Sequence, residues 1–95
     1  KKGGFGDYKI DVTKRTVLYK NDPVRLSTKE FDLFVYLVQN KGQIIPKETL
    51  YERIWEDEYN DESRTLELHV QRLRKKAMLS DKLNTVYGYG YRLDN

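Results

Sequence analysis

The sequence has no cysteine, a single histidine and a single tryptophan, and these shortages narrow its chemistry. Without cysteine there is neither a disulfide nor a thiolate metal site. His69 has no second histidine or cysteine to share a metal ion, so no metal site is predicted. No apolar run comes near the length of about 18 residues that a membrane-spanning helix needs, and no segment resembles a signal peptide. The many carboxylates form no paired acid–base constellation, so we predict no enzyme, no cofactor and no membrane span in this segment.

The charged residues are unevenly distributed along the chain. Its 95 residues suit one domain with a modest core. The net charge of +3 decides little by itself. Residues 56–62 carry five acids and no base, whereas residues 64–76 carry five bases and one acid. Two adjacent blocks of opposite sign predict two surfaces with two different partners.

The first half of the chain predicts a small sheet followed by a helix. Residues 1–6 (KKGGFG) are predicted to be a flexible linker or the cut end of a longer protein, and residues 7–95 one domain. Ser27 and Glu30 form a capping box that starts a helix, and Gly42 is predicted to be its C′ residue. Alternating or β-branched segments before it predict three antiparallel strands, at 8–12, 16–19 and 24–26.

The second half predicts two more helices and a hairpin. Ile44 and Ile45 return to a sheet, and Pro46 suits the start of a helix over residues 47–55. A basic helix is predicted over residues 63–77. Two strands within residues 83–93 then form a hairpin whose connection contains the four residues Tyr87, Gly88, Tyr89 and Gly90, with both glycines available for positive φ.

The basic helix has two unlike faces. Leu66, Val70, Leu73 and Ala77 recur at helical spacing and form an apolar stripe for burial. The opposite face is polar and basic, which suits a helix that lies along nucleic acid, although a merely solvated charged face is the alternative. This outer face is centred on Thr65, Leu68, His69, Arg72 and Lys76.

The order of sheet, three helices and hairpin resembles the OmpR/PhoB-type winged helix-turn-helix domain, the output half of bacterial two-component response regulators. The resemblance covers residues 8–93, and its markers keep the family's order and spacing. These markers are Leu26 with residues 28–33 (TKEFDL), residues 47–50 (KETL) with Ile54 and Trp55, residues 64–70 (RTLELHV) with 72–76 (RLRKK), and Thr85, Val86, Gly88, Gly90 and Tyr91. It implies an α+β fold with an N-terminal antiparallel sheet, three helices and a C-terminal β-hairpin wing.

The resemblance also implies which residues contact double-stranded DNA. The third helix would enter the major groove, with bases contacted by Thr65, Leu68, His69 and Arg72. Arginine can bond both acceptors of guanine, so Arg72 is the best candidate for direct readout. Leu68 has an alternative role in packing beneath the wing tyrosines, and Trp55 would be mostly core. The implied backbone contacts are Arg64, Arg74, Lys75, Lys76, Trp55 and Thr85.

Three residues depart from the family pattern. Tyr87 stands where many members carry an arginine in the wing, and Gln71 stands where a second arginine is common. Pro46 replaces a frequent Ser or Thr cap. The first two departures predict a weaker electrostatic contribution or a shifted sequence preference. Tyr87, Tyr89 and Tyr91 alternate, so in an ideal strand they share one face, either for packing or for stacking on bases.

The acidic segment corresponds to the connection between the second and third helices. In some family members this connection contacts RNA polymerase, and the candidate residues here are Glu56, Asp57, Glu58 and Asp61. A solvated loop is the alternative.

We therefore predict a cytoplasmic output domain that binds specific DNA sequences to regulate transcription. The implied partners are double-stranded DNA, RNA polymerase, a receiver domain in the full-length chain and a second copy in a homodimer on DNA. Two alternatives stay open. One is the same domain in a non-phosphorylated activator, and the other is a winged helix that binds an acidic protein.

Overall fold

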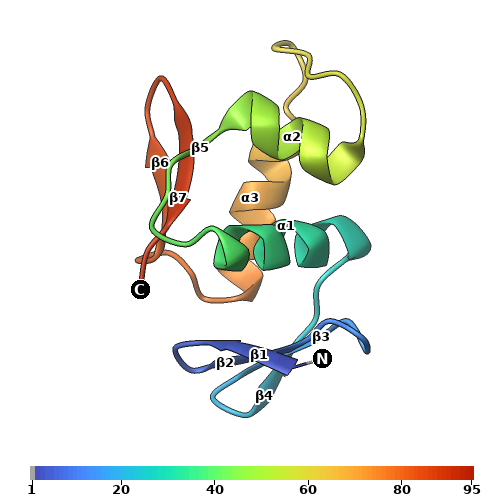
Figure 1. Ribbon diagram of the computed structural model, residues 1–95, viewed down its shortest axis with the longest axis vertical. Helices are drawn as coiled ribbons and strands as arrows, with labels where there is room; N and C mark the ends of the chain where they lie inside the picture. The colour runs from blue at the N-terminus through green and yellow to red at the C-terminus, as the bar shows by residue number, and fades with distance from the viewer. Residues whose placement is uncertain (1) are drawn as a thin grey trace.

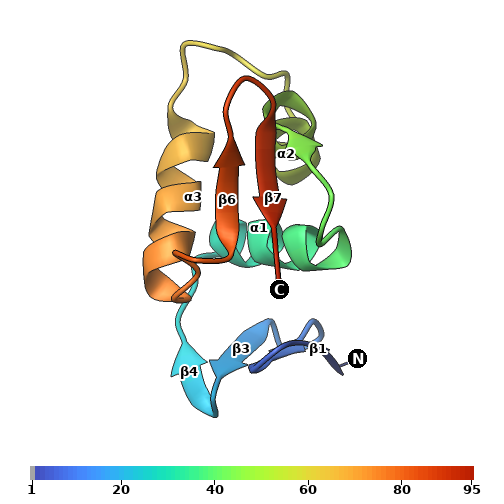
Figure 2. The ribbon, with the colours of Figure 1, turned by 90° about the vertical axis from the view of Figure 1, so that its left-hand side faces the viewer.

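The computed structural model describes residues 2–95, and Lys1 lies outside the described residues. A four-stranded sheet lies at one end of the molecule, beneath α1, and the hairpin stands beside α3 at the other end (Figures 1 and 2). This α+β arrangement confirms the predicted winged helix. The elements are β1 (Lys2–Phe5), β2 (Tyr8–Asp11), β3 (Thr16–Tyr19), β4 (Asp22–Val24), α1 (Thr28–Gln39), β5 (Ile45–Pro46), α2 (Lys47–Trp55), α3 (Thr65–Lys76), β6 (Leu83–Val86) and β7 (Gly90–Leu93).

The N-terminal sheet has one strand more than predicted. Its order is β1-β2-β3-β4, and every neighbouring pair is antiparallel. The predicted flexible lead-in is wrong for residues 2–5, because they pair with β2 and place the ring of Phe5 in the core, 3% exposed. Gly6 at φ 56° permits the tight turn that returns the chain from Phe5 to Tyr8. The last strand is 22–24 rather than 24–26.

Tyr8 connects this sheet to the C-terminal end of α3 through hydrogen bonds. Its ring is buried against Phe34 and Tyr19, and its hydroxyl donates to the carbonyl oxygens of Ala77 and Met78. Burial, with smaller contributions from Tyr19 and Asp7, raises the pKa of Tyr8 to about 12. The sheet is therefore a platform that supports the C-terminal end of α3.

Helix α1 begins with the predicted capping box. Ser27 Oγ accepts from the Glu30 backbone N–H, and Glu30 Oε1 accepts from the Ser27 N–H at 2.9 Å. The helix ends one residue earlier than predicted, since Asn40 is its C-cap and Gly42 follows two residues later. Gly42 still takes a positive φ of 84° and donates its N–H to Leu93 of β7 at 2.8 Å. The buried side chains of the helix are Phe31, Leu33, Phe34 and Leu37, with Glu30.

The hairpin joins a second, three-stranded sheet of order β5-β7-β6. Gly88 takes φ 83°, as predicted for its turn. The sequence also predicts a positive φ for Gly90, and this is wrong, because Gly90 does not take positive φ. Glycine is required at this position because of close packing. Its backbone pairs with Pro46, and a Cβ at Gly90 would lie 1.9 Å from the carbonyl oxygen of Ile45. Glycine therefore lets β7 approach β5 closely.

Candidate nucleic-acid interface

Helix α3 has the two faces that its periodicity predicts. Leu66, Val70 and Leu73 are buried, as is the C-cap residue Ala77. They face the core that α1 also lines, and the two helices are in contact. The opposite face carries Leu68, which is 50% exposed, and the exposed side chains of Gln71, Arg72 and Lys75. The buried stripe holds α3 against the domain and leaves its polar face open.

Only part of the positive charge on α3 is available to a partner. Within residues 2–95, no hydrogen bond or ion pair engages the side chains of Arg72 and Lys75. Arg64 forms an ion pair with Glu67 at 2.9 Å, and both side chains are exposed. Lys76 Nζ lies 2.8 Å from Oε1 of the buried Glu30. Arg72 and Lys75 are therefore the two cations of this helix that are free to meet a ligand.

Arg74 joins α3 to the hairpin. Its Nε donates to the carbonyl oxygen of Leu83 at 2.8 Å, and its Nη2 donates to Thr85 Oγ1 at 2.7 Å. The guanidinium also lies 5.9 Å from the centre of the Tyr91 ring. Arg74 and Thr85, both predicted to contact DNA backbone, are thus hydrogen-bonded to each other. The pair fixes the distance between the exposed helix face and the wing.

His69 and Trp55 lie together beside the exposed face. The two rings meet edge to face with centroids 4.9 Å apart, and Trp55 stacks on Tyr51 at the same separation. Both His69 and Trp55 are partly buried. His69 Nδ1 lies 2.8 Å from the carbonyl oxygen of Thr65, one turn earlier. His69 is therefore held by α2 and by its own helix rather than extending freely.

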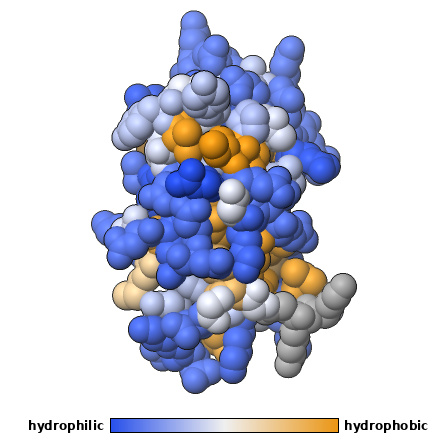
Figure 3. All heavy atoms as spheres, turned by 60° about the vertical axis from the view of Figure 1, so that its left-hand side comes forward, coloured by the Kyte–Doolittle hydropathy of each residue, from blue (hydrophilic) through white to orange (hydrophobic). Residues whose placement is uncertain are grey.

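The wing tyrosines do not share one face. Tyr87 is 88% exposed and Tyr89 is 70% exposed, whereas Tyr91 is 7% exposed. The prediction of a common stripe is wrong because the chain turns at Gly88, so only Tyr91 lies in a regular strand. Burial is the main cause that raises the pKa of Tyr91. Figure 3, which brings this side of the molecule forward, shows a mostly hydrophilic surface with a band of apolar atoms in its upper half and further apolar atoms lower down.

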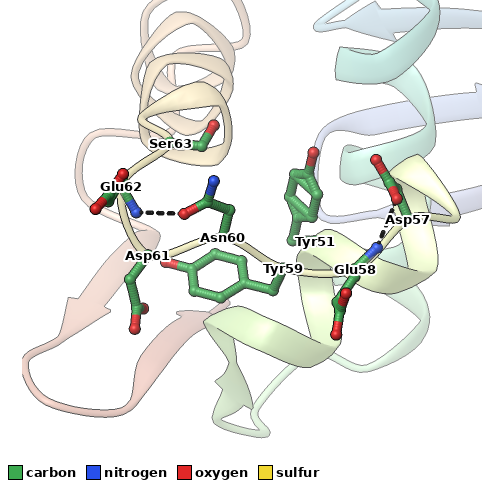
Figure 4. A pocket seen from close by; sticks show the side chains of 8 residues that line it. All are labelled: Tyr51, Asp57, Glu58, Tyr59, Asn60, Asp61, Glu62 and Ser63. Carbon is green, nitrogen blue, oxygen red and sulfur yellow. Dashed lines mark hydrogen bonds between the residues drawn. The ribbon is translucent and has the colours of Figure 1, made fainter.

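The acidic connection between α2 and α3 is an ordered loop. Asn60 accepts from the backbone N–H of Glu62 at 2.9 Å, and the Tyr59 ring packs edge to face on Tyr51 (Figure 4). Glu56 begins the loop with φ 55°, in the left-handed region. Its acidic side chains are exposed, and all but Glu56 line an open hollow. The residues that line it are Tyr51, Asp57, Glu58, Tyr59, Asn60, Asp61, Glu62 and Ser63.

Within residues 2–95, no group of three or more His, Asp or Glu side chains is placed to hold a metal ion. The same part of the chain contains no helix with the length and apolar character needed to cross a membrane.

Three helices with an exposed basic third helix and an adjoining hairpin define a winged helix-turn-helix domain. A family model described as "Transcriptional regulatory protein, C terminal" matches residues 21–93, which is most of the chain. The chain belongs to this family, the OmpR/PhoB-type DNA-binding domains of transcriptional regulators, and the predicted family is confirmed.

Similar proteins agree with this membership. The uncharacterized transcriptional regulatory protein YclJ of Bacillus subtilis is 43% identical in an alignment of 90 residues that covers 92% of this chain and 40% of that protein. The sensory transduction protein RegX3 of Mycolicibacterium smegmatis is 37% identical over 94% of this chain and 41% of its own length. The chain thus spans about two fifths of the length of these relatives.

Solved structures show the same fold. The DNA-binding domain of Klebsiella pneumoniae RstA, in complex with the RstA box, has a TM-score of 0.91 and 30% identity. That match covers 99% of this chain and 97% of that one. The response regulator DrrB of Thermotoga maritima, an OmpR/PhoB homologue, has a TM-score of 0.84 and 32% identity over 99% of this chain and 44% of its own.

Proposed function

We propose that this domain binds specific sequences of double-stranded DNA and thereby regulates transcription. The observation that carries the proposal is the exposed face of α3, where Arg72 and Lys75 have no partner among residues 2–95 and lie beside a hairpin that Arg74 holds. A helix of this kind fits the major groove of B-form DNA. The RstA domain, which shares the fold and 30% of its residues, was solved in complex with a DNA element.

The base contacts we propose are Thr65, Leu68, His69 and Arg72. Arg72 has no intramolecular partner among residues 2–95, so its guanidinium is free to bond guanine O6 and N7. Leu68 is half exposed and offers methyl groups to a thymine methyl. These contacts would supply sequence preference.

The backbone contacts we propose fall into two groups. Lys75 is free, and Arg64 would exchange its exposed pairing with Glu67 for a phosphate. Thr85 accepts from Arg74, which leaves its own hydroxyl proton for a phosphate oxygen. Trp55 has no hydrogen-bond partner among the described residues, and no unpartnered side-chain nitrogen there is buried, so its indole N–H faces solvent. We assign Arg74 and Lys76 mainly to bracing the structure.

We extend the proposal to the whole protein on the basis of its relatives, of which this chain spans about two fifths. It would be the output domain of a cytoplasmic response regulator, controlled by phosphorylation of a receiver domain and bound to DNA as a homodimer. The alternative of a non-phosphorylated activator predicts a full-length sequence without a phosphoacceptor domain.

The acidic loop is our candidate for contact with RNA polymerase. Its charge would repel DNA, so it suits a protein partner instead. Glu56, Asp57, Glu58 and Asp61 are exposed and lie on a loop whose backbone is held by Asn60 and Glu52. A pre-ordered loop binds without a large ordering cost.

Selection from a random pool of double-stranded DNA tests the proposed function. The domain is expected to enrich a short motif, and its affinity should fall steeply with salt as counterions are released. A domain that retains no DNA even at low salt would contradict the proposal and favour the alternative of an acidic protein partner.

A further inference from the structure

The hydrogen bond of His69 determines which of its ring nitrogens carries the proton. Nδ1 lies 2.8 Å from the carbonyl oxygen of Thr65. A carbonyl oxygen only accepts hydrogen bonds, so Nδ1 must carry the hydrogen. In a neutral imidazole the other nitrogen, Nε2, then has a lone pair and no hydrogen. His69 in this form is an acceptor at Nε2.

Nε2 is open to a ligand. His69 is partly buried, yet no side-chain nitrogen or oxygen of residues 2–95 is both buried and without a hydrogen-bond partner. No partner for Nε2 exists among these residues, so this atom contacts solvent. Its ring is held in place by the Trp55 ring, 4.9 Å away and nearly perpendicular. The acceptor is therefore preformed and accessible.

We propose that His69 reads an exocyclic amino group in the major groove, adenine N6 or cytosine N4, with Nε2 as the acceptor. These amino groups are the hydrogen-bond donors that bases present there. The inference rests on the proposed DNA binding and adds the chemistry of one base position. Donation from His69 to guanine or to a phosphate would need either a second proton or the loss of the bond to Thr65.

Arg72, three residues further along α3, is a hydrogen-bond donor, whereas His69 is an acceptor at Nε2. Its guanidinium has only donors, so it selects the acceptor edge of guanine. Arg72 on the exposed face and His69 beside it would therefore read complementary hydrogen-bonding patterns. The pair predicts a motif in which the position set by Arg72 prefers guanine and the position set by His69 prefers adenine or cytosine.

The experiment compares DNA selected by the wild-type domain and by His69→Ala at about pH 8, above the ordinary imidazole range. The position whose preference disappears in the variant is then altered chemically in a single duplex. Purine replaces adenine, or pyrimidin-2-one replaces cytosine, so that only the amino group is removed. The wild-type domain should lose about three- to tenfold in affinity, the size of one hydrogen bond. His69→Ala should lose nothing further.

Gln39→Ala is the control, since Gln39 is exposed on α1 and lies outside the proposed DNA contacts. Its dependence on the amino group should equal that of the wild type. Circular dichroism would establish that both variants are folded. Where the position is adenine, a second control replaces its N7 by carbon, which should leave wild-type binding unchanged.

Three results would overturn the inference. One is a His69-dependent position that requires purine N7 or guanine O6, which would make His69 a donor. Another is a motif with no position that depends on His69, and the third is an equal loss from amino removal in wild type and variant. A domain that enriches no motif at all would instead overturn the proposed function, and this inference with it.

Discussion

Lys76 and Arg74 show that the role of a cation depends on the residues it meets after folding. Both lie on a basic helix, and the family resemblance predicts that both contact DNA backbone. Within the domain, Lys76 pairs with Glu30, which is 2% exposed, and Arg74 donates to Leu83 and Thr85 of β6. Neither cation's partner follows from helical spacing. Burial of a carboxylate requires a partner charge, and Lys76 supplies it.

The ion pair between Glu30 and Lys76 leads to a prediction about stability and pH. Burial alone would raise the pKa of Glu30, but hydrogen bonds from Lys76 and Ser27 outweigh it and leave the pKa below the ordinary 4.5. A carboxyl whose pKa is lower in the folded state stabilises the fold above its unfolded pKa. That stabilisation is lost as pH falls below about 4.5 and through the folded value.

Glu30→Gln should therefore lower the free energy of unfolding by about 1–3 kcal/mol at neutral pH, because a charged hydrogen bond is lost. The difference from wild type should shrink as the pH is lowered into the acidic range. Urea unfolding at a series of pH values measures it. Glu48→Gln, at an exposed acid in the first turn of α2, is the control and should have little effect. A difference that does not change with pH would contradict this account.

The residues of the candidate site could be predicted only in part. Helical periodicity separates the buried stripe from the outer face of α3, and the structure confirms that division. Periodicity could not reveal that His69 is held by Trp55, because the contact joins two helices through tertiary packing. It also could not reveal which cations are already paired. Which of the predicted residues touch DNA stays a prediction.

At the scale of elements, the wing depends on one close approach of two strands. A Cβ at Gly90 would lie 1.9 Å from Ile45 O and 2.9 Å from Lys47 N, both backbone atoms that cannot rotate away. Gly90→Ala should therefore separate β7 from β5 and destabilise the domain by about 1–3 kcal/mol or more. Thermal unfolding measures this loss.

Gly88→Ala is the comparison for the same hairpin. Gly88 has φ 83°, but a Cβ added there would meet open space, so alanine at this position suffers backbone strain alone, about 1–2 kcal/mol. Binding should also suffer more in Gly90→Ala, because β7 carries the wing. Equal stability of wild type and Gly90→Ala would contradict the close approach.

The wing tip leads to a prediction about salt. No charged residue lies between Lys82 and Arg92, and the two exposed side chains at the tip are Tyr87 and Tyr89. Contact through tyrosine is apolar packing with a hydroxyl hydrogen bond, and it releases no counterion. Tyr87→Ala should lower affinity for DNA severalfold and leave the dependence of log K on log salt unchanged.

Tyr87→Arg and Lys75→Ala are the matched variants for that measurement. An arginine at the tip that reaches a phosphate should steepen the slope by about one, and loss of Lys75 should reduce it by about one. Titrations at several salt concentrations give each slope. A change of slope in Tyr87→Ala would mean that the wing acts through charge after all.

At the scale of the whole molecule, the order of the helices and the hairpin could be predicted from the sequence, but strand β1 and the contacts between distant elements could not. The capping box, the turn glycines and the helical periods mark each helix of the winged fold. Strand β1 could not be predicted because lysine and glycine dominate its sequence and only Phe5 has a strong preference for burial. The bond from Tyr8 to the end of α3 joins residues 69 apart in sequence, a contact that no local pattern reports.

The fold as a whole converts these local contacts into one surface. The N-terminal sheet supports the end of α3 through Tyr8, α1 anchors Lys76, and α2 holds His69. Arg74 sets the hairpin beside the helix. The exposed face of α3 and the wing therefore form one preorganised surface, and preorganisation lowers the cost of binding to a DNA double helix.

Arg72→Ala, in a selection from random double-stranded DNA, shows whether the exposed face of α3 reads DNA sequence. This variant should weaken specific binding by about 1–3 kcal/mol and lose preference at one base position. Lys75→Ala should weaken binding to all sequences about equally and keep the motif. An unchanged motif in Arg72→Ala would contradict the assignment of this face as the reading surface.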